Sequence, residues 1–241
     1  IIADDELTNP NMEIAYSEAI KIEPDFEIGE QVVEPFGITQ FDRRDIQSIH
    51  QMLKAKVMEF EKENIYQKYK DRIGEIVTGE VSQVWKKELL VLDDEDYELV
   101  LPRTEMIQAD FYKKGDSIRA VVDRVEFKNN TPFVILSRTS PVLLERLFEQ
   151  EVPEIFDGLI TIRKIVRQPG ERAKVAVESY DDRIDPVSAC VGMKGSRIHG
   201  IVRELRNENI DVINFSNNLS VFVSRALSPA KISSLRIDEE K

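Results

Sequence analysis

Residues 185–198 read Asp185-Pro-Val-Ser-Ala-Cys-Val-Gly-Met-Lys-Gly-Ser-Arg-Ile198 and predict a short helix, a four-residue turn and a second helix. Asp185 is a good N-cap, and Pro186 suits the first helical position, where its missing N–H would have no intrahelical partner. Gly192 ends the first helix. Gly195 opens the second, whose free backbone N–H groups make its start electropositive. Because glycine has no side chain, the stretch indicates a place where a phosphate can approach the backbone.

The Gly-x-x-Gly spacing is a weak signal by itself. With 10 glycines in 241 residues, it is expected by chance about 0.4 times per chain. An ordinary helix–turn–helix corner explains it equally well until the flanks are considered. If the turn does hold a nucleic-acid backbone, the candidate residues are Gly192, Met193, Lys194, Gly195, Ser196 and Arg197.

The flanks of the turn supply its context. Ser140 and Pro141 predict an N-cap and a first-position proline for a helix with an apolar side. Strands are expected over 158–167, 173–178 and 210–215, and a last helix over 219–227. The order helix, strand, strand, helix, turn, helix, strand is that of a type II (prokaryotic) KH domain, a fold that clamps single-stranded nucleic acid with such a turn. We therefore predict a KH domain over 140–231.

Residues 72–139 change to alternating, β-branched segments, which predict strands. The expected strands are 75–84, 88–92, 98–101, 117–128 and 133–137. Turn signals separate them, among them the acidic run 93–96. Five short strands in a segment of this size favour a small closed barrel of the OB type.

OB barrels bind single strands through aromatic side chains and a basic groove. The candidates here are Trp85, Phe127, Lys86, Lys87, Arg119 and Arg124. Core packing is an equal alternative to base stacking for Trp85. The acidic run 93–96 would also repel phosphate, so the barrel is the weaker of the two expected RNA sites.

Residues 1–71 begin with an acidic stretch and a short helical segment near 14–20, and the clearest helix of the chain lies within 38–71. Its apolar residues repeat at three- and four-residue spacing. They are Ile46, Ile49, Leu53, Val57 and Phe60. This stripe either packs within its own fold or docks on a partner, because a helix of this length needs apolar contacts to be stable. Little sequence precedes it, so we expect the first half of this domain to be missing.

The net charge of −12 argues against nucleic acid as a ligand until its distribution is considered. Residues 1–71 hold 16 acids and 8 bases, whereas residues 157–231 hold 9 acids and 12 bases. The positive surplus therefore surrounds the Gly-x-x-Gly turn. A single cysteine excludes an internal disulfide and fits a reducing cytosol. No apolar run approaches a membrane span, and no signal peptide is recognisable.

Six stretches carry a resemblance to the NusA family of bacterial transcription factors, which extends from about Asn9 to the C-terminus. They are 185–206, 147–155, 210–213, 226–232, 101–105 and 136–139. The resemblance implies an α+β multidomain chain: a partial polymerase-binding domain over 1–71, an S-one-type OB barrel over 72–139, the first KH domain over 140–231, and the opening strand of a second KH domain over 232–241.

The family's function is implied in the same way. The resemblance implies a cytoplasmic, non-enzymatic factor, without cofactor or metal, that stays bound to RNA polymerase during elongation and modulates pausing, termination and antitermination. The N-terminal domain docks on the polymerase, the barrel and KH domains hold the nascent single-stranded RNA, and other elongation or antitermination factors are possible partners. Because the family's two KH domains bind RNA together, a chain with only one of them is expected to bind RNA more weakly than the whole protein.

Two other classes stay open. The same domain order occurs in RNA-binding cap subunits of exosome-type degradation complexes, and a KH fold can also serve only as a protein adaptor. The sequence itself suggests no catalytic group. His50 and His199 lack partners for acid–base chemistry, Cys190 is expected to be buried, and Asp181, Asp182 and Asp185 are explained by turn and capping duties.

Overall fold

The long helix expected within 38–71 is α2 (Arg43–Asp71). The computed structural model describes residues 1–3, 13–33, 42–128, 131–230, 232 and 234–235. Contacts divide the chain into two units, Ile1–Met58 and Glu59–Lys241. The first unit holds a parallel pair, β1 (Ile2–Ala3) and β2 (Ile14–Ala15), followed by α1 (Tyr16–Ile22), which is the short helix expected near 14–20.

The apolar stripe of α2 is exposed along its whole length. Its least exposed members are Ile46 and Ile49, at 46% each, and Phe60 is 68% exposed. The end of the same helix is different, because Tyr69 is fully buried in the core of the barrel that follows. Its hydroxyl donates to the carboxylate of Asp93 in the acidic turn. One carboxylate of that turn is therefore used to fix the helix to the barrel.

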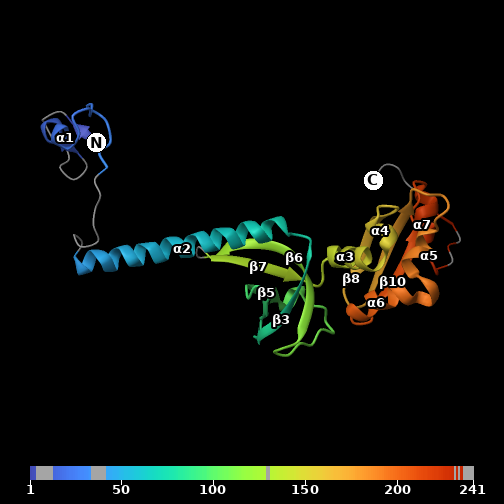
Figure 1. Cartoon of the computed structure of the whole chain (residues 1–241). Helices are drawn as coiled ribbons and strands as arrows, with labels where there is room; N and C mark the ends of the chain where they lie inside the picture. The colour runs from blue at the N-terminus through green and yellow to red at the C-terminus, as the bar shows by residue number, and fades with distance from the viewer. Residues whose placement is uncertain (4–12, 34–41, 129–130, 231, 233, 236–241) are drawn as a thin grey trace. The chain divides into compact units, whose positions relative to one another are not determined.

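The five predicted strands form a closed barrel, β3-β4-β5-β7-β6 (Figure 1). They are β3 (Ile76–Val84), β4 (Glu88–Leu92), β5 (Glu98–Pro102), β6 (Ser117–Lys128) and β7 (Thr131–Ser137). A short 3₁₀ turn, η2 (Arg103–Glu105), follows β5. All neighbours are antiparallel except β5 and β7, which are parallel. The sequence prediction of the OB-type barrel is confirmed.

The C-terminal part has the expected KH order. It comprises α3 (Pro141–Glu151), α4 (Pro153–Phe156), β8 (Ile160–Gln168), β9 (Arg172–Ser179), α5 (Pro186–Val191), η3 (Met193–Gly195), α6 (Ser196–Glu204), β10 (Asn209–Asn214) and α7 (Leu219–Leu227). The sheet order is β10-β9-β8, with β9 antiparallel to β8 and parallel to β10. The N-caps Ser140 and Asp185 accept from backbone N–H groups as predicted.

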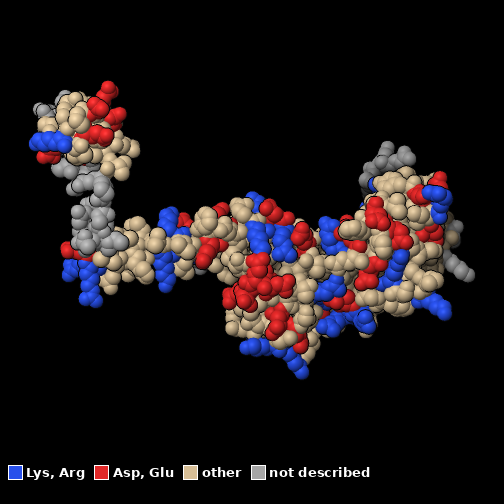
Figure 2. All heavy atoms as spheres, in the orientation of Figure 1, with Lys and Arg blue, Asp and Glu red and all other residues tan. Residues whose placement is uncertain are grey.

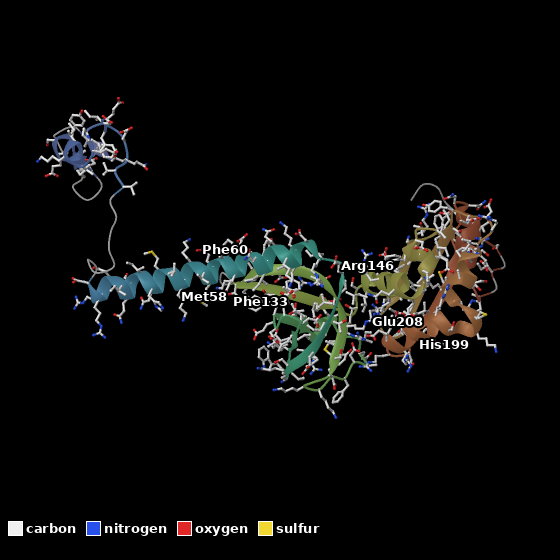
Figure 3. All side chains as sticks on the ribbon, in the orientation of Figure 1. Met58, Phe60, Phe133, Arg146, His199 and Glu208 are labelled. Carbon is white, nitrogen blue, oxygen red and sulfur yellow. The ribbon has the colours of Figure 1, made fainter. Side chains whose placement is uncertain are left out.

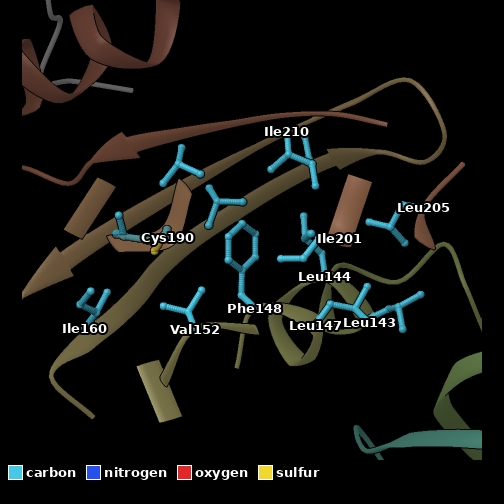
Figure 4. Packing of buried hydrophobic residues seen from close by; sticks show 14 of the residues in the cluster. Leu143, Leu144, Leu147, Phe148, Val152, Ile160, Cys190, Ile201, Leu205 and Ile210 are labelled. Carbon is cyan, nitrogen blue, oxygen red and sulfur yellow. The ribbon is translucent and has the colours of Figure 1, made fainter. Parts of the chain in front are cut away.

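The core of this part lies between the sheet and helices α3, α5 and α6 (Figure 4). Phe148 of α3 stands in its centre and is fully buried, and Cys190 and Ile201 close it from the two helices that flank the turn. These helices are therefore fixed by apolar packing, which also fixes the turn between them. The strand expected at the start of a second KH domain falls mostly outside the described residues, and 232, 234 and 235 are not in a strand.

Two glycines give opposite expectations for the same substitution. A Cβ at Gly79 in β3 would lie 2.4 Å from the Leu92 carbonyl oxygen and 2.6 Å from Val91 Cγ1. Gly79→Ala is therefore expected to lower the free energy of unfolding by about 1–2 kcal/mol. A Cβ at Gly200 in α6 meets nothing closer than 3.6 Å, so Gly200→Ala is expected to be neutral or to stabilise by up to about 1 kcal/mol. Urea denaturation of the two variants checks the contrast, and equal effects would contradict it.

Candidate nucleic-acid interface

The Gly-x-x-Gly turn adopts a backbone that requires its glycines. Gly192 has φ +75° and Gly195 has φ +78°, in the left-handed region that side chains other than glycine disfavour. Lys194 between them also has positive φ, at +52°. A Cβ at Gly195 would lie 2.8 Å from the ring of His199, and one at Gly192 would lie 3.1 Å from the backbone nitrogen of Arg197. The tight turn therefore depends on both glycines.

The turn presents its two middle side chains to solvent. Met193 is 89% exposed, and Lys194 and Ser196 are exposed as well. Arg197 is half-buried, because its Nη1 donates to Glu154 Oε2 at 2.8 Å and to the Ala189 carbonyl at 2.7 Å. Of the two cations named from the sequence, Lys194 is thus the exposed one, and Arg197 braces the turn against α4 and α5.

Cys190 precedes the turn on α5 and is fully buried. Burial raises the pKa of its thiol to about 12. Because the thiolate is the reactive form, we expect Ellman's reagent to leave the folded chain unlabelled at mildly alkaline pH and to label it stoichiometrically in denaturing guanidinium chloride. Rapid labelling of the folded chain would show that α5 opens and that the helix before the turn is not rigid.

The barrel candidates do not lie together in one place. Trp85, Lys86 and Lys87 share the β3–β4 turn and are exposed, with Trp85 at 47%. The Phe127 ring lies 4.5 Å from that of Tyr66, so it packs against α2.

The two arginine candidates of the barrel are held by other side chains. Arg119 donates to Gln150 of α3 and lies 4.0 Å from Glu204 of α6. It therefore sits where the barrel meets the KH fold. The Arg124 guanidinium is paired with Asp123 and Glu126 on its own strand. The structure does not bring these two arginines together with Trp85.

A buried ionic cluster joins the barrel to the KH fold. Arg138, directly after β7, is fully buried and donates to Asp110 at 2.8 Å and to Glu204 Oε1 at 2.9 Å. Its Nη2 also donates to the Glu204 carbonyl at 2.9 Å. Asp110 accepts in addition from Arg206 at 3.1 Å. Burial alone would lower the pKa of Arg138, but attraction to Asp110 and the hydrogen bonds to it raise that pKa, so the guanidinium is always charged.

A second buried pair lies on the KH side of this contact. The side chains of Arg167 of β8 and of Glu208, which precedes β10, are both fully buried and lie 2.8 Å apart (Glu208 is labelled in Figure 3). Arg167 also donates to the carbonyls of Arg138 and Ser140 at 2.8 and 2.9 Å. Residues 138–140, which link the barrel to the KH fold, are therefore held by hydrogen bonds from the guanidinium groups of Arg138 and Arg167. Sequence reasoning assigns no role to the side chains of these residues.

Surface charge in the barrel is mixed. On the face shown in Figure 2, acidic atoms gather over the middle of the barrel and basic atoms lie at its lower edge.

No group of acidic, histidine and cysteine side chains among the described residues could hold a metal ion. Within the same residues, no helix is both long and apolar enough to cross a bilayer.

A five-stranded OB barrel, joined through buried ion pairs to a type II KH fold with an exposed Gly-x-x-Gly turn, defines a class of nucleic-acid-binding chains. Residues 138–215 match the NusA-like first KH domain, and residues 1–63 match the NusA N-terminal domain. The chain belongs to the NusA family and corresponds to its N-terminal region.

The relatives agree with this assignment along nearly the whole chain. The transcription termination/antitermination protein NusA of Thermus thermophilus is 36% identical over 236 residues, which are 98% of this chain and 61% of the relative. The protein of the same name from Bacillus subtilis is 37% identical over 237 residues, 98% of this chain and 64% of the relative. In Rickettsia conorii the identity is 34%, with 46% of the relative covered. The chain thus spans less than two thirds of these relatives.

Proposed function

We propose that this chain is part of a transcription elongation factor that holds single-stranded nascent RNA and modulates pausing, termination and antitermination. The observation that carries the proposal is the exposed Gly192–Gly195 turn, with Lys194 at its tip and two fixed helices behind it. The names of the relatives, transcription termination/antitermination proteins, point to the same role. That role requires no catalytic group and no cofactor.

RNA polymerase is the proposed protein partner, and residues 1–71 are the proposed docking domain. Support comes from the match of residues 1–63 to the NusA N-terminal domain. The exposed apolar residues of α2, from Ile46 to Phe60, are a surface of the kind that a partner covers. We also propose three domain limits. The barrel spans 72–139, the first KH domain spans 140–231, and a second KH domain starts within 232–241.

The test has two arms. Fluorescence anisotropy of a labelled single-stranded RNA measures binding to the chain, with duplex DNA of equal length as control; we expect saturable binding that weakens as salt rises. Copurification with RNA polymerase, before and after ribonuclease treatment, measures the protein contact. Absence of RNA binding would leave a protein adaptor, whereas RNA binding with capture of a ribonuclease complex instead of polymerase would favour the degradation-complex alternative.

A further inference from the structure

A groove of about 740 Å³ lies at the join between the barrel and the KH fold. The start of β3 lines it from the barrel side, and helices α3 and α4 line it from the KH side. The side chains that matter most here are Glu75, Ile76, Arg146, Glu149, Pro153 and Phe156. None of the residues from the Gly-x-x-Gly turn lines this groove, so it is a separate surface of the KH fold.

A large aromatic ring in the groove is left in water. Phe156 of α4 is 81% exposed, and Pro153 at the start of the same helix is exposed as well. Ile76 on the opposite wall is half-buried and packs against the KH core. Within the described part of the chain, the ring of Phe156 contacts no other aromatic ring. Exposing such a ring costs free energy, which a partner recovers by covering it.

The helices beside the groove are acidic. Residues 141–157, which include α3 and α4, contain five acids and one base. The base, Arg146, is already engaged, because its guanidinium donates to the carboxylate of Glu149 at 2.6 and 2.7 Å. Glu145 and Asp157, in contrast, form no ion pair with any residue that the structure describes. Their carboxylates are therefore available to a cationic ligand and repel an anionic one.

The walls of the groove are fixed before any ligand arrives. Arg146 of α3 donates to the carbonyl of Gly74, just before β3, at 2.9 Å. Arg119 of β6 donates to Gln150 of α3, which also lines the groove. Hydrogen bonds thus run from each fold to the other beside the groove. A ligand that enters it needs little reordering of the protein.

The charge and the exposed ring together define the class of ligand. Nucleic acids and anionic lipid surfaces are bound through lysine and arginine side chains, and here the only cation of the lining is already paired. A metal ion or a polyamine would leave most of the Phe156 ring in water. A peptide segment with lysines or arginines around an apolar side chain satisfies both features, since an aromatic anchor supplies binding energy and complementary charge supplies specificity.

We propose that this groove docks a basic segment of a protein partner, whose apolar side chain covers Phe156 while its cations face Glu145 and Asp157. The surface is distinct from the Gly192–Gly195 turn, because Glu154 of α4 binds Arg197 beside that turn and does not line the groove. The docking site therefore goes beyond the proposed function and does not depend on RNA binding.

The probe is a short, fluorescein-labelled helical peptide of leucine and lysine, and its anisotropy measures binding to the full chain. We expect saturable binding, with oligolysine of equal charge at least about tenfold weaker because it has no apolar side chain. Phe156→Ala is expected to weaken binding of the leucine–lysine peptide about tenfold, as removal of an aromatic anchor does. Phe60→Ala removes an exposed ring from α2, 68% exposed, and is the matched control with unchanged affinity.

Charge reversal gives the second readout. Glu145→Lys with Asp157→Lys is expected to weaken peptide binding and to reduce its salt dependence. The control is Asp94→Lys with Glu98→Lys in the barrel, two exposed acids that give the same change in net charge. Equal weakening by the two pairs would show that net charge alone attracts the peptide and would overturn the proposal. Circular dichroism establishes that each variant is folded.

Fluorine NMR locates the bound peptide. A single 4-trifluoromethylphenylalanine in place of Phe156 is expected to shift its resonance with the same midpoint as the anisotropy. Peptide binding that leaves this resonance unmoved, or that Phe60→Ala weakens as much as Phe156→Ala, would overturn the groove as the docking site. A shift caused by single-stranded RNA and not by the peptide would also overturn it. The RNA anisotropy and polymerase copurification described above decide the proposed function independently of these outcomes.

Discussion

Replacing Arg138 by methionine is expected to lower the free energy of unfolding by about 3 kcal/mol, because it removes a buried cation from beside the buried carboxylate of Asp110. Arg138 and Asp110 are both fully buried, and Arg138 supplies donors to Asp110, to Glu204 and to two backbone carbonyls. Asp110 keeps its bonds from the Ile107 amide and from Arg206, which holds the loss near the lower end of the range for broken buried pairs, about 3–5 kcal/mol. Urea denaturation measures the change.

The matched control is Arg183→Met. Arg183 also pairs with an aspartate, Asp181, but its side chain is 89% exposed, so solvent screens the pair and we expect little change in stability. A double-mutant cycle that combines Asp110→Asn with Arg138→Met tests whether the buried charge of Asp110 causes the loss of stability. Asp110→Asn removes the buried carboxylate charge that Arg138 no longer compensates, so it should cost less stability in the methionine background than in the native chain. Equal losses from Arg138→Met and Arg183→Met would show that the buried cluster does not hold the barrel to the KH fold.

The sequence was sufficient for the elements but not for this cluster. Strands 88–92 and 117–128 and helix 219–227 were predicted with the bounds that they have, because apolar periodicity and turn residues act locally. The bonds of Arg138 to Asp110 and Glu204 join residues 28 and 66 positions apart. Charged residues are usually exposed, and no local pattern indicates that these are buried.

Two of the stretches that carry the family resemblance prove to be parts of one contact. Glu105 of 101–105 accepts from the hydroxyls of Ser137 and Thr139 at 2.7 and 2.6 Å, and its carbonyl accepts from the Arg138 amide at 2.8 Å. These stretches therefore identify the join after the barrel. The side chains of Glu105, Ser137 and Thr139 bond to one another, so the resemblance at these three residues reports on architecture.

For the candidate RNA sites, too, the features that are local in sequence could be predicted and the others could not. The Gly192–Gly195 turn was predictable because its helix caps and glycines are consecutive in sequence. The exposed ring of Phe111 was missed. The sequence Phe111-Tyr-Lys-Lys114, an aromatic pair followed by two lysines, is the local signal that could have pointed to it.

Replacing Met193 and Lys194 by aspartate is expected to weaken single-stranded RNA binding about tenfold or more, because an attraction to phosphate becomes a repulsion at the tip of the turn, and to reduce the salt slope by about 0.7 for each phosphate released. The glycines and Arg197, which shape and brace the turn, stay in place, so the variant should remain folded. The control is Met52→Asp with Lys54→Asp on α2, two exposed residues that give the same change in net charge. If both variants weaken binding equally, net charge alone accounts for the effect; if the turn variant binds like the native chain, the turn does not hold RNA.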